Sequence, residues 1–150
     1  MDVTEIPFVK KAGVIRSTKG VLELPFNQTN LNHLHTIHAS AQFTLAETAS
    51  GEALQTIFPE LVGKVVPVLR DSQVKFKKPA TKTVSAHPMV SDEAISKFRE
   101  QFNKKGRSSI TVDVEITDSE NVVTCVGTFN WFVQSIERIK DARLPHTHTG

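Results

Sequence analysis

The chain has 150 residues, a net charge of +2, 39% apolar residues and 23% charged residues. This composition is that of a soluble globular chain of one-domain size, and it excludes an intrinsically disordered chain. Lysine and arginine are spread along the chain and mixed with acidic residues, so we expect no nucleic-acid partner.

Three features bear on the cellular compartment. The single cysteine, Cys125, has no second cysteine to pair with, which indicates a reducing compartment. No stretch approaches the roughly 20 consecutive apolar residues of a transmembrane helix. The first residues lack the apolar run and cleavage site of a signal peptide. We therefore expect a cytoplasmic protein with no membrane partner.

The first half of the chain predicts a hairpin, a loop and one long helix. Residues 14–24 are β-prone around a turn, and residues 25–36 are rich in Asn and His and indicate an ordered loop. Residues 38–57 have helical spacing, with an apolar, alanine-rich half of the helical wheel. The other half carries a polar stripe, which consists of Ser40, Thr44, Glu47, Thr48, Gly51 and Gln55.

The second half predicts strands interrupted by one short helix. Residues 74–76 and 81–90 are β-like, and residues 91–105 form a capped amphipathic helix that stops at a glycine. Residues 110–116 alternate strictly between apolar and polar side chains, and residues 122–133 form a long final strand. Together these elements predict an α+β fold in which an antiparallel sheet packs on one main helix. We expect a single domain over residues 1–150, with its core at 14–133 and a flexible tail at 141–150.

The junction between loop and helix, residues 32–49, resembles hotdog-fold acyl-CoA thioesterases of the phenylacetyl-CoA type. Asn32 lies six residues before His38, and Glu47 lies nine residues after it within Leu-Ala-Glu, as in that family. Downstream, the pattern Val-x-Phe-x-x-Pro-Ala at residues 74–80 resembles the strand end that follows in the family. The resemblance implies a hotdog fold, in which the antiparallel sheet wraps around one long central helix.

Some positions depart from the family pattern and mark a divergent member. His35 replaces a usual glycine, and Ala39 and Ser40 replace the two glycines after the histidine. Some relatives supply a hydroxyl from a later strand, and the corresponding position here lies near Leu69, which has none.

The resemblance implies an active site for hydrolysis of an acyl-CoA or a similar acyl thioester. Glu47 would act as base or nucleophile, and the backbone N–H of Ala39 would bind the oxyanion, with Ser40 beside the substrate. Asn32 and His38 would position the reacting groups. The family needs no cofactor, and coenzyme A enters as part of the substrate. Its cleft lies between subunits, which implies a homodimer or a dimer of dimers.

Glu47 has two interpretations from its position on the wheel. It lies at the edge of the polar stripe, flanked by Leu54 and Phe43, where partial desolvation would raise its pKa and suit a general base. Alternatively, it is a solvated helix residue or one end of an ion pair at a subunit interface.

Other side chains also allow more than one interpretation. His33, His35 and His38 suggest a metal site, but no cysteine or carboxylate stands at familiar ligand spacing, so we expect no metal. Cys125 is interpreted as a buried small hydrophobe. Four lysines either contact solvent or meet the phosphates of coenzyme A, namely Lys75, Lys77, Lys78 and Lys82.

Two rival functions remain open at this point. One is another hotdog chemistry, the hydration or dehydration of an acyl thioester. The other is a hotdog protein that binds an acyl group or a small carboxylate without catalysis.

Overall fold

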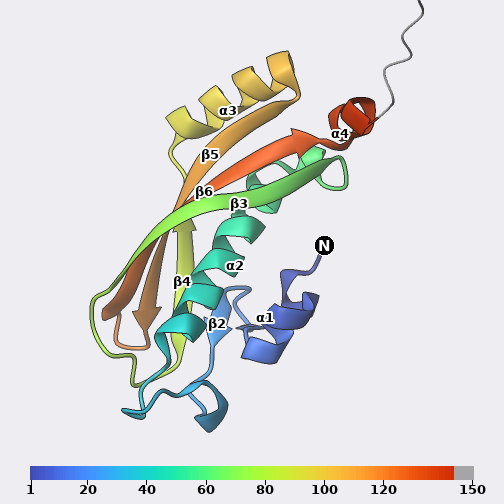
Figure 1. The fold of residues 1–150 in the computed structure, drawn as a ribbon. Helices are drawn as coiled ribbons and strands as arrows, with labels where there is room; N and C mark the ends of the chain where they lie inside the picture. The colour runs from blue at the N-terminus through green and yellow to red at the C-terminus, as the bar shows by residue number, and fades with distance from the viewer. Residues whose placement is uncertain (144–150) are drawn as a thin grey trace, which may run out of the picture.

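A computed structural model describes residues 1–143 of the chain (Figure 1). Its helices are α1 (Pro7–Ala12), α2 (Ala39–Ile57), α3 (Asp92–Lys105) and α4 (Ile136–Arg143), with 3-10 turns at Val3–Glu5, Gln28–Asn30 and Pro59–Leu61. Its strands are β1 (Ile15–Arg16), β2 (Leu22–Leu24), β3 (Val65–Phe76), β4 (Val84–Met89), β5 (Arg107–Asp118) and β6 (Val123–Ser135).

The six strands form one antiparallel sheet in the order β1-β2-β4-β5-β6-β3. The sheet curves around α2, which lies along its concave face (Figure 1). This layout confirms the predicted α+β hotdog fold. The short strands β1 and β2 form the predicted hairpin, and β3 is the long strand at the opposite edge.

The sequence of α2 explains both its boundaries and its close packing. His38 caps the helix, because its Nδ1 accepts a hydrogen bond from the Ser40 N–H at 3.0 Å. Ala46, Ala49 and Ala53 are buried, and their small side chains let the helix approach the sheet closely. The helix covers almost all of the predicted range 38–57.

The strand pattern and the short helix also follow the prediction. In β5, buried residues alternate with exposed or half-buried ones over most of its length. Ser91 caps α3 by accepting from the Ala94 N–H at 3.1 Å, and Gly106 ends the helix at a φ of 68°. Phe98 of α3 is buried against Phe58, with ring centroids 4.5 Å apart.

Three segments differ from the sequence prediction. Strand β3 begins at Val65 rather than near residue 74, because it is an exposed edge strand with a bulge between Leu69 and Asp71 and so lacks alternation. Helix α1 was not predicted, since its six residues are too few to show a helical period. Helix α4 includes residues 141–143 of the predicted tail, and residues 144–150 lie outside the described residues.

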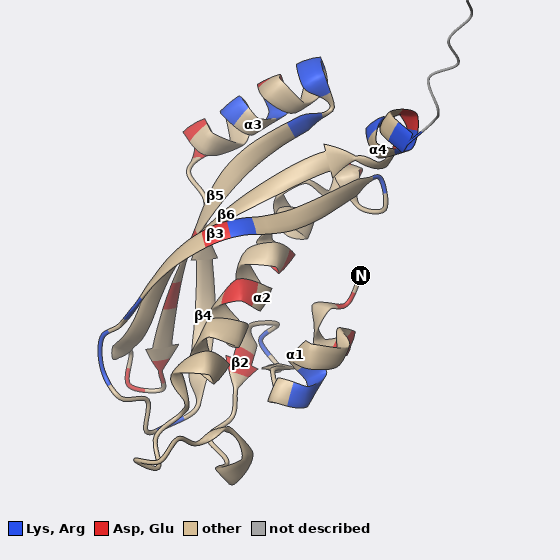
Figure 2. Cartoon of the chain, in the orientation of Figure 1, with Lys and Arg blue, Asp and Glu red and all other residues tan. Residues whose placement is uncertain are grey.

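Charge is distributed unevenly over the fold. Charged residues gather on α3 and α4 and in the middle of β3, whereas β4 and β6 carry none (Figure 2). Within residues 1–143, no helix combines the length and the apolar character needed to cross a membrane.

Candidate functional site

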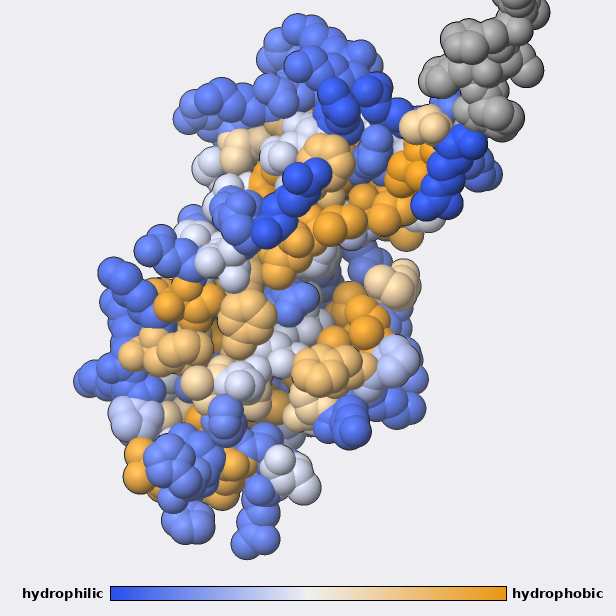
Figure 3. Space-filling model, in the orientation of Figure 1, coloured by the Kyte–Doolittle hydropathy of each residue, from blue (hydrophilic) through white to orange (hydrophobic). Residues whose placement is uncertain are grey.

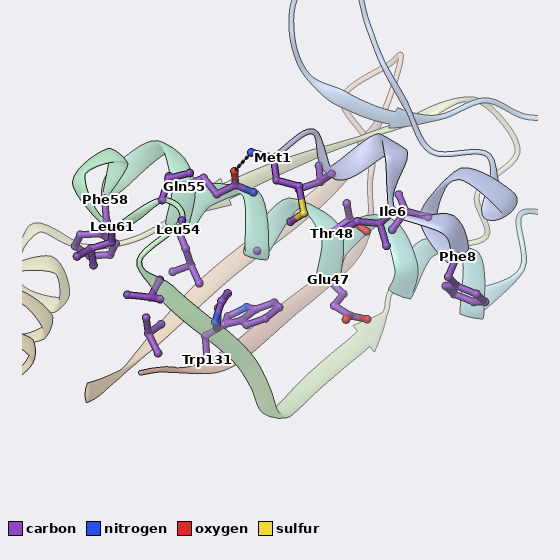
Figure 4. A pocket seen from close by; sticks show the side chains of 18 of the residues that line it. Met1, Ile6, Phe8, Glu47, Thr48, Leu54, Gln55, Phe58, Leu61 and Trp131 are labelled. Atoms are coloured by element: carbon purple, nitrogen blue, oxygen red, sulfur yellow. Dashed lines mark hydrogen bonds between the residues drawn. The ribbon is translucent and has the colours of Figure 1, made fainter. Parts of the chain in front are cut away.

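A pocket of about 550 Å³ lies along one side of α2, within the size range of small-molecule sites. Its walls are α2, the inner faces of β3 and β6, and the segment of residues 1–12 that precedes β1 (Figure 4). Most of the lining is apolar. The polar stripe of α2 faces this pocket, since its members Thr44, Glu47, Thr48, Gly51 and Gln55 all line it.

Glu47 supplies the one carboxylate of the pocket lining. Its side chain is half-buried, and this burial raises the pKa of its carboxyl above the ordinary glutamate value. None of the ion pairs among residues 1–143 includes Glu47. The other acidic residue of α2, Glu52, is instead paired with Arg16. The predicted direction of the Glu47 pKa shift is therefore confirmed, and its interpretation as one end of an ion pair at a subunit interface stays open.

Trp131 of β6 faces the pocket from the side of the sheet (Figure 4). Its Nε1–H donates to the Ser50 hydroxyl at 2.9 Å, and that hydroxyl donates to the Glu47 carbonyl at 2.7 Å. Gly51 lets the ring lie close to α2, because a Cβ there would meet two ring carbons at 3.3 Å. These contacts hold the tryptophan in place beside the helix turn that carries Glu47.

The start of α2 holds three of the other predicted site residues. The Ser40 N–H is already bonded to His38 Nδ1, so it has an acceptor within the chain. No hydrogen bond among the described residues uses the Ala39 N–H. Ala39 is exposed, so this N–H at the positive end of the helix dipole is open to a ligand.

Asn32 organises the loop that leads into α2. Its Oδ1 accepts from the N–H groups of Leu34 at 2.9 Å and Thr36 at 3.1 Å, and its Nδ2 donates to the Thr36 hydroxyl at 2.9 Å. The Asn32 amide is therefore used inside the loop, which shapes the approach to the first turn of α2.

The structure does not bring the five predicted site residues together within one chain. Glu47 lines the pocket, whereas Asn32, His38, Ala39 and Ser40 do not. Ala39 and Glu47 are eight residues apart on α2, which is about 12 Å along the helix axis.

The remaining candidates lie away from the pocket. Among the described residues, no three His, Cys, Asp or Glu side chains are placed to hold a metal ion. Lys75, Lys77 and Lys78 are exposed, and Lys82 forms an ion pair with Glu120 at 2.6 Å. Cys125 is buried, as predicted, and burial raises the pKa of its thiol to about 11, which argues against a nucleophilic role.

Sequence reasoning missed two parts of the pocket. Trp131 lies two residues beyond Phe129 on the inward register of β6, so the period of two could have placed it facing α2. The N-terminal wall carries a weaker signal, a proline at the first position of α1 and a glycine just after its end.

The chain is similar to known proteins over most of its length. A family model described as "Domain of unknown function (DUF4442)" matches residues 7–133. No curated protein matches the chain.

Several solved structures share the fold. A Pseudomonas aeruginosa protein of unknown function, described as a probable thioesterase, is 22% identical and has a TM-score of 0.76 over 89% of this chain and 91% of its own. A thioesterase from Haemophilus influenzae is 18% identical, with a TM-score of 0.70 over 97% of this chain and 90% of its own. A Bacillus halodurans protein solved with CoA is 20% identical, with a TM-score of 0.61 over 80% of this chain and 70% of its own. At these identities the likeness establishes the fold alone.

Proposed function

The chain belongs to the DUF4442 family of domains of unknown function, and we propose that it hydrolyses an acyl-CoA or a similar acyl thioester. Two of its structural neighbours support this class of reaction, one described as a thioesterase and one solved with CoA. In the proposal, Glu47 activates water or attacks the thioester, and the acyl group occupies the pocket beside α2.

The observation that carries the proposal is the Glu47 carboxylate in a largely apolar pocket. Burial raises its pKa, which makes the ionised carboxylate a stronger base. The apolar walls around it suit an acyl chain, and Thr44 and Thr48 add few competing hydrogen bonds. Their hydroxyls already donate to backbone carbonyls of α2, at 2.9 Å and 2.6 Å.

The reaction proceeds by one of two routes from this carboxylate. As a general base, Glu47 takes a proton from water, the oxygen attacks the carbonyl carbon, and the tetrahedral intermediate collapses with cleavage of the C–S bond. The departing thiolate takes up the proton and leaves as the thiol. As a nucleophile, Glu47 attacks the carbonyl carbon and forms an anhydride with the acyl group while the C–S bond breaks and the thiolate leaves. Water then hydrolyses the anhydride, which releases the carboxylic acid, returns the Glu47 carboxylate and supplies the proton that the thiolate takes up.

The oxyanion formed during attack needs a hydrogen-bond donor, and the Ala39 N–H is our candidate. A donor must lie about 3 Å from the developing oxyanion. Because Ala39 and Glu47 of one chain are about 12 Å apart along α2, they do not serve the same carbonyl. We therefore propose that Glu47 of one subunit works with Ala39 of the partner subunit, with His38 and Asn32 holding that first turn in place.

The edge of the sheet supports this pairing of subunits. β3 is a twelve-residue edge strand whose backbone pairs with β6 on one side. Hydrophobic residues gather along its first part (Figure 3), where Val66 and Val68 are exposed, whereas its middle carries Arg70 and Asp71. A long edge strand with an apolar first part leaves backbone groups and apolar side chains available for pairing with a second copy.

A second candidate function is binding without catalysis. The Asn32 amide is used within its own loop and the Ser40 N–H is used by His38, so fewer polar groups remain for a reacting thioester. In that case the same pocket holds an acyl group or a small carboxylate and releases it unchanged.

Assay of purified protein against short, long and aromatic acyl-CoAs tests the proposal. We expect wild type to release free thiol and Glu47→Gln to lower kcat by about a hundredfold or more. Glu52→Gln is the matched control on the same helix, outside the pocket, and should retain activity. The absence of cleavage by wild type across the panel rules out the hydrolase and favours the binding function. Full activity in Glu47→Gln rules out the assignment of Glu47.

A further inference from the structure

The outer wall of the pocket is made by residues 1–12, which we call the N-terminal segment. Five of its side chains line the pocket, and all five are apolar: Met1, Val3, Ile6, Phe8 and Val9. The family model begins at residue 7, so the first three of these precede the matched region. Membership of the family therefore does not account for this part of the wall.

The N-terminal segment is a built structure that packs on α2. Val3 and Val9 are 3% and 7% exposed, and both also line the pocket. Asp2 caps the first turn by accepting from the Thr4 N–H at 3.0 Å. Gly13 ends α1 with a φ of 88°, which favours glycine. None of the charged side chains within residues 1–12 lines the pocket.

The segment and α2 run in opposite directions along the pocket. Met1 lies beside Gln55, with its backbone nitrogen 3.1 Å from Gln55 Oε1, whereas Ile6 lies beside Thr48 (Figure 4). Position along the segment therefore corresponds to position along α2: Ile6 lies beside Thr48, which follows Glu47 in the sequence, and Val3 lies between Ile6 and the Met1 end near Gln55.

The pocket is elongated in the same direction. Thr44 and Leu54 both line it and are ten residues apart on α2, which is about 15 Å along the helix. Beyond Leu54 the lining continues with Phe58, Leu61 and Phe98, so the far end is apolar. Phe58 and Leu61 lie at one end of the view and Phe8 at the other, with Glu47 and Trp131 between them (Figure 4).

We propose that the N-terminal segment sets the acyl-chain length that the pocket accepts, with Val3 facing the distal part of a medium to long aliphatic chain and Ile6 the part near the thioester. This inference rests on the proposed function for the placement of the thioester at Glu47. The acyl chain runs from Glu47 toward Phe58, between α2 and the N-terminal segment. Burial of each methylene against these walls stabilises the complex.

Binding of neutral fatty alcohols tests the wall without any hydrolysis. 1-Hexanol and 1-dodecanol carry no charge to be repelled by Glu47, and Trp131, the single tryptophan of the chain, reports pocket occupancy through its fluorescence. Val3→Phe should exclude about two methylenes of the longer alcohol, which weakens its binding by about tenfold. Binding of 1-hexanol should stay within about twofold of wild type.

Two further variants keep the test decisive. Ile6→Phe narrows the pocket at the Glu47 end and should weaken the binding of both alcohols. It replaces Val3→Phe as the test if thermal unfolding shows that Val3→Phe is not folded. Ile15→Phe is the control, since Ile15 is exposed and lies outside the pocket. The proposal is overturned if the Val3 and Ile6 variants bind both alcohols as the Ile15 variant does, or if Trp131 emission does not respond to either alcohol.

The outcomes separate this inference from the proposed function. If wild type cleaves no thioester but binds 1-dodecanol, and Val3→Phe weakens that binding as expected, the hydrolase proposal is refuted. The proposed role of the N-terminal segment is then supported. If the protein cleaves thioesters but its alcohol binding is unchanged in the Val3 and Ile6 variants, the hydrolase proposal is supported. The proposed role of the N-terminal segment is then refuted.

Discussion

The first turn of α2 and its middle turns differ in how their polar groups are used. In the first turn, the Ser40 N–H is bonded to His38 while the exposed Ala39 N–H is left open. In the middle, Glu47 is half-buried in an apolar pocket and belongs to no ion pair of residues 1–143. The first turn of α2 therefore offers a donor for an anion, and the middle of the helix offers a base.

This difference bears on how many subunits a working site requires. The pocket and its carboxylate are complete within one chain, whereas the donor that a thioesterase needs lies about 12 Å away on the same helix. In our proposals, binding of an acyl chain needs one subunit and catalysis needs two.

The largest expected effect comes from removing the donor at the first turn. Ala39→Pro deletes the N–H and should lower kcat by about a hundredfold to a thousandfold, the effect of losing an oxyanion donor. The helix should survive, because Ala39 is the first helical residue and His38 has the extended backbone that a following proline requires, with φ −61° and ψ 139°. Steady-state assays against an acyl-CoA measure the loss.

Ala39→Ser is the control for this change, since it retains the N–H and should keep most activity. Thermal unfolding checks that both variants remain folded. If Ala39→Pro is folded and as active as wild type, the first turn of α2 has no role as donor.

Complementation between two inactive variants tests whether the two regions come from different subunits. Co-expressed Glu47→Gln and Ala39→Pro chains should form mixed dimers in which one of two sites is intact, restoring about a quarter of wild-type activity under random pairing. Each variant alone should be nearly inactive. Purified mixed dimers carrying two different tags give the measurement, and an inactive mixed dimer would place both groups in one subunit's site.

Glu47, in the middle of α2, should make both stability and activity depend on pH. The burial that raises its pKa above the ordinary 4.5 means that the folded chain holds this proton more tightly than the unfolded chain. Stability from this group is therefore present at low pH and is lost as pH rises from about 4.5 through the raised value. Activity that needs the ionised base should rise over the same interval.

Urea unfolding of wild type and Glu47→Gln at several pH values measures the stability effect. The variant should gain stability relative to wild type near neutral pH, and the gain should shrink as pH falls through the raised pKa and disappear below about pH 4.5. A gain independent of pH, or a loss at neutral pH, would contradict desolvation as the dominant influence on Glu47.

The contrast between regions also explains how far the sequence predicts this molecule. The long helix and the placement of Glu47 follow from helical periodicity, because both depend on spacing within one element. Strand β3 before residue 74 follows from its pairing with β6, a contact between distant segments that local pattern does not encode. The same applies to Val3, which faces the pocket because the N-terminal segment packs on α2.

The predicted grouping of Asn32, His38, Ala39 and Ser40 with Glu47 came from resemblance and not from spacing. The helix itself separates Glu47 from the other four, since each residue adds about 1.5 Å along its axis. In our proposal their assembly into one site depends on a second chain, which a single sequence does not reveal by pattern alone.

The smallest expected effect comes from a substitution at Gly51, where helix propensity and the packing of Trp131 have opposite effects on stability. Gly51→Ala favours the helix by about 1 kcal/mol, since alanine is the better helix former. The added Cβ would meet Cζ2 and Cη2 of Trp131 at 3.3 Å, and the bond from Trp131 to Ser50 limits how far the ring can move away. We expect the two effects nearly to cancel, so that the free energy of unfolding changes by less than about 1 kcal/mol. The emission of Trp131 should shift because the ring is displaced by a few tenths of an ångström. A loss well above that limit would show that the tryptophan is held rigidly against α2, whereas a full gain with unchanged emission would show that it moves freely within the pocket.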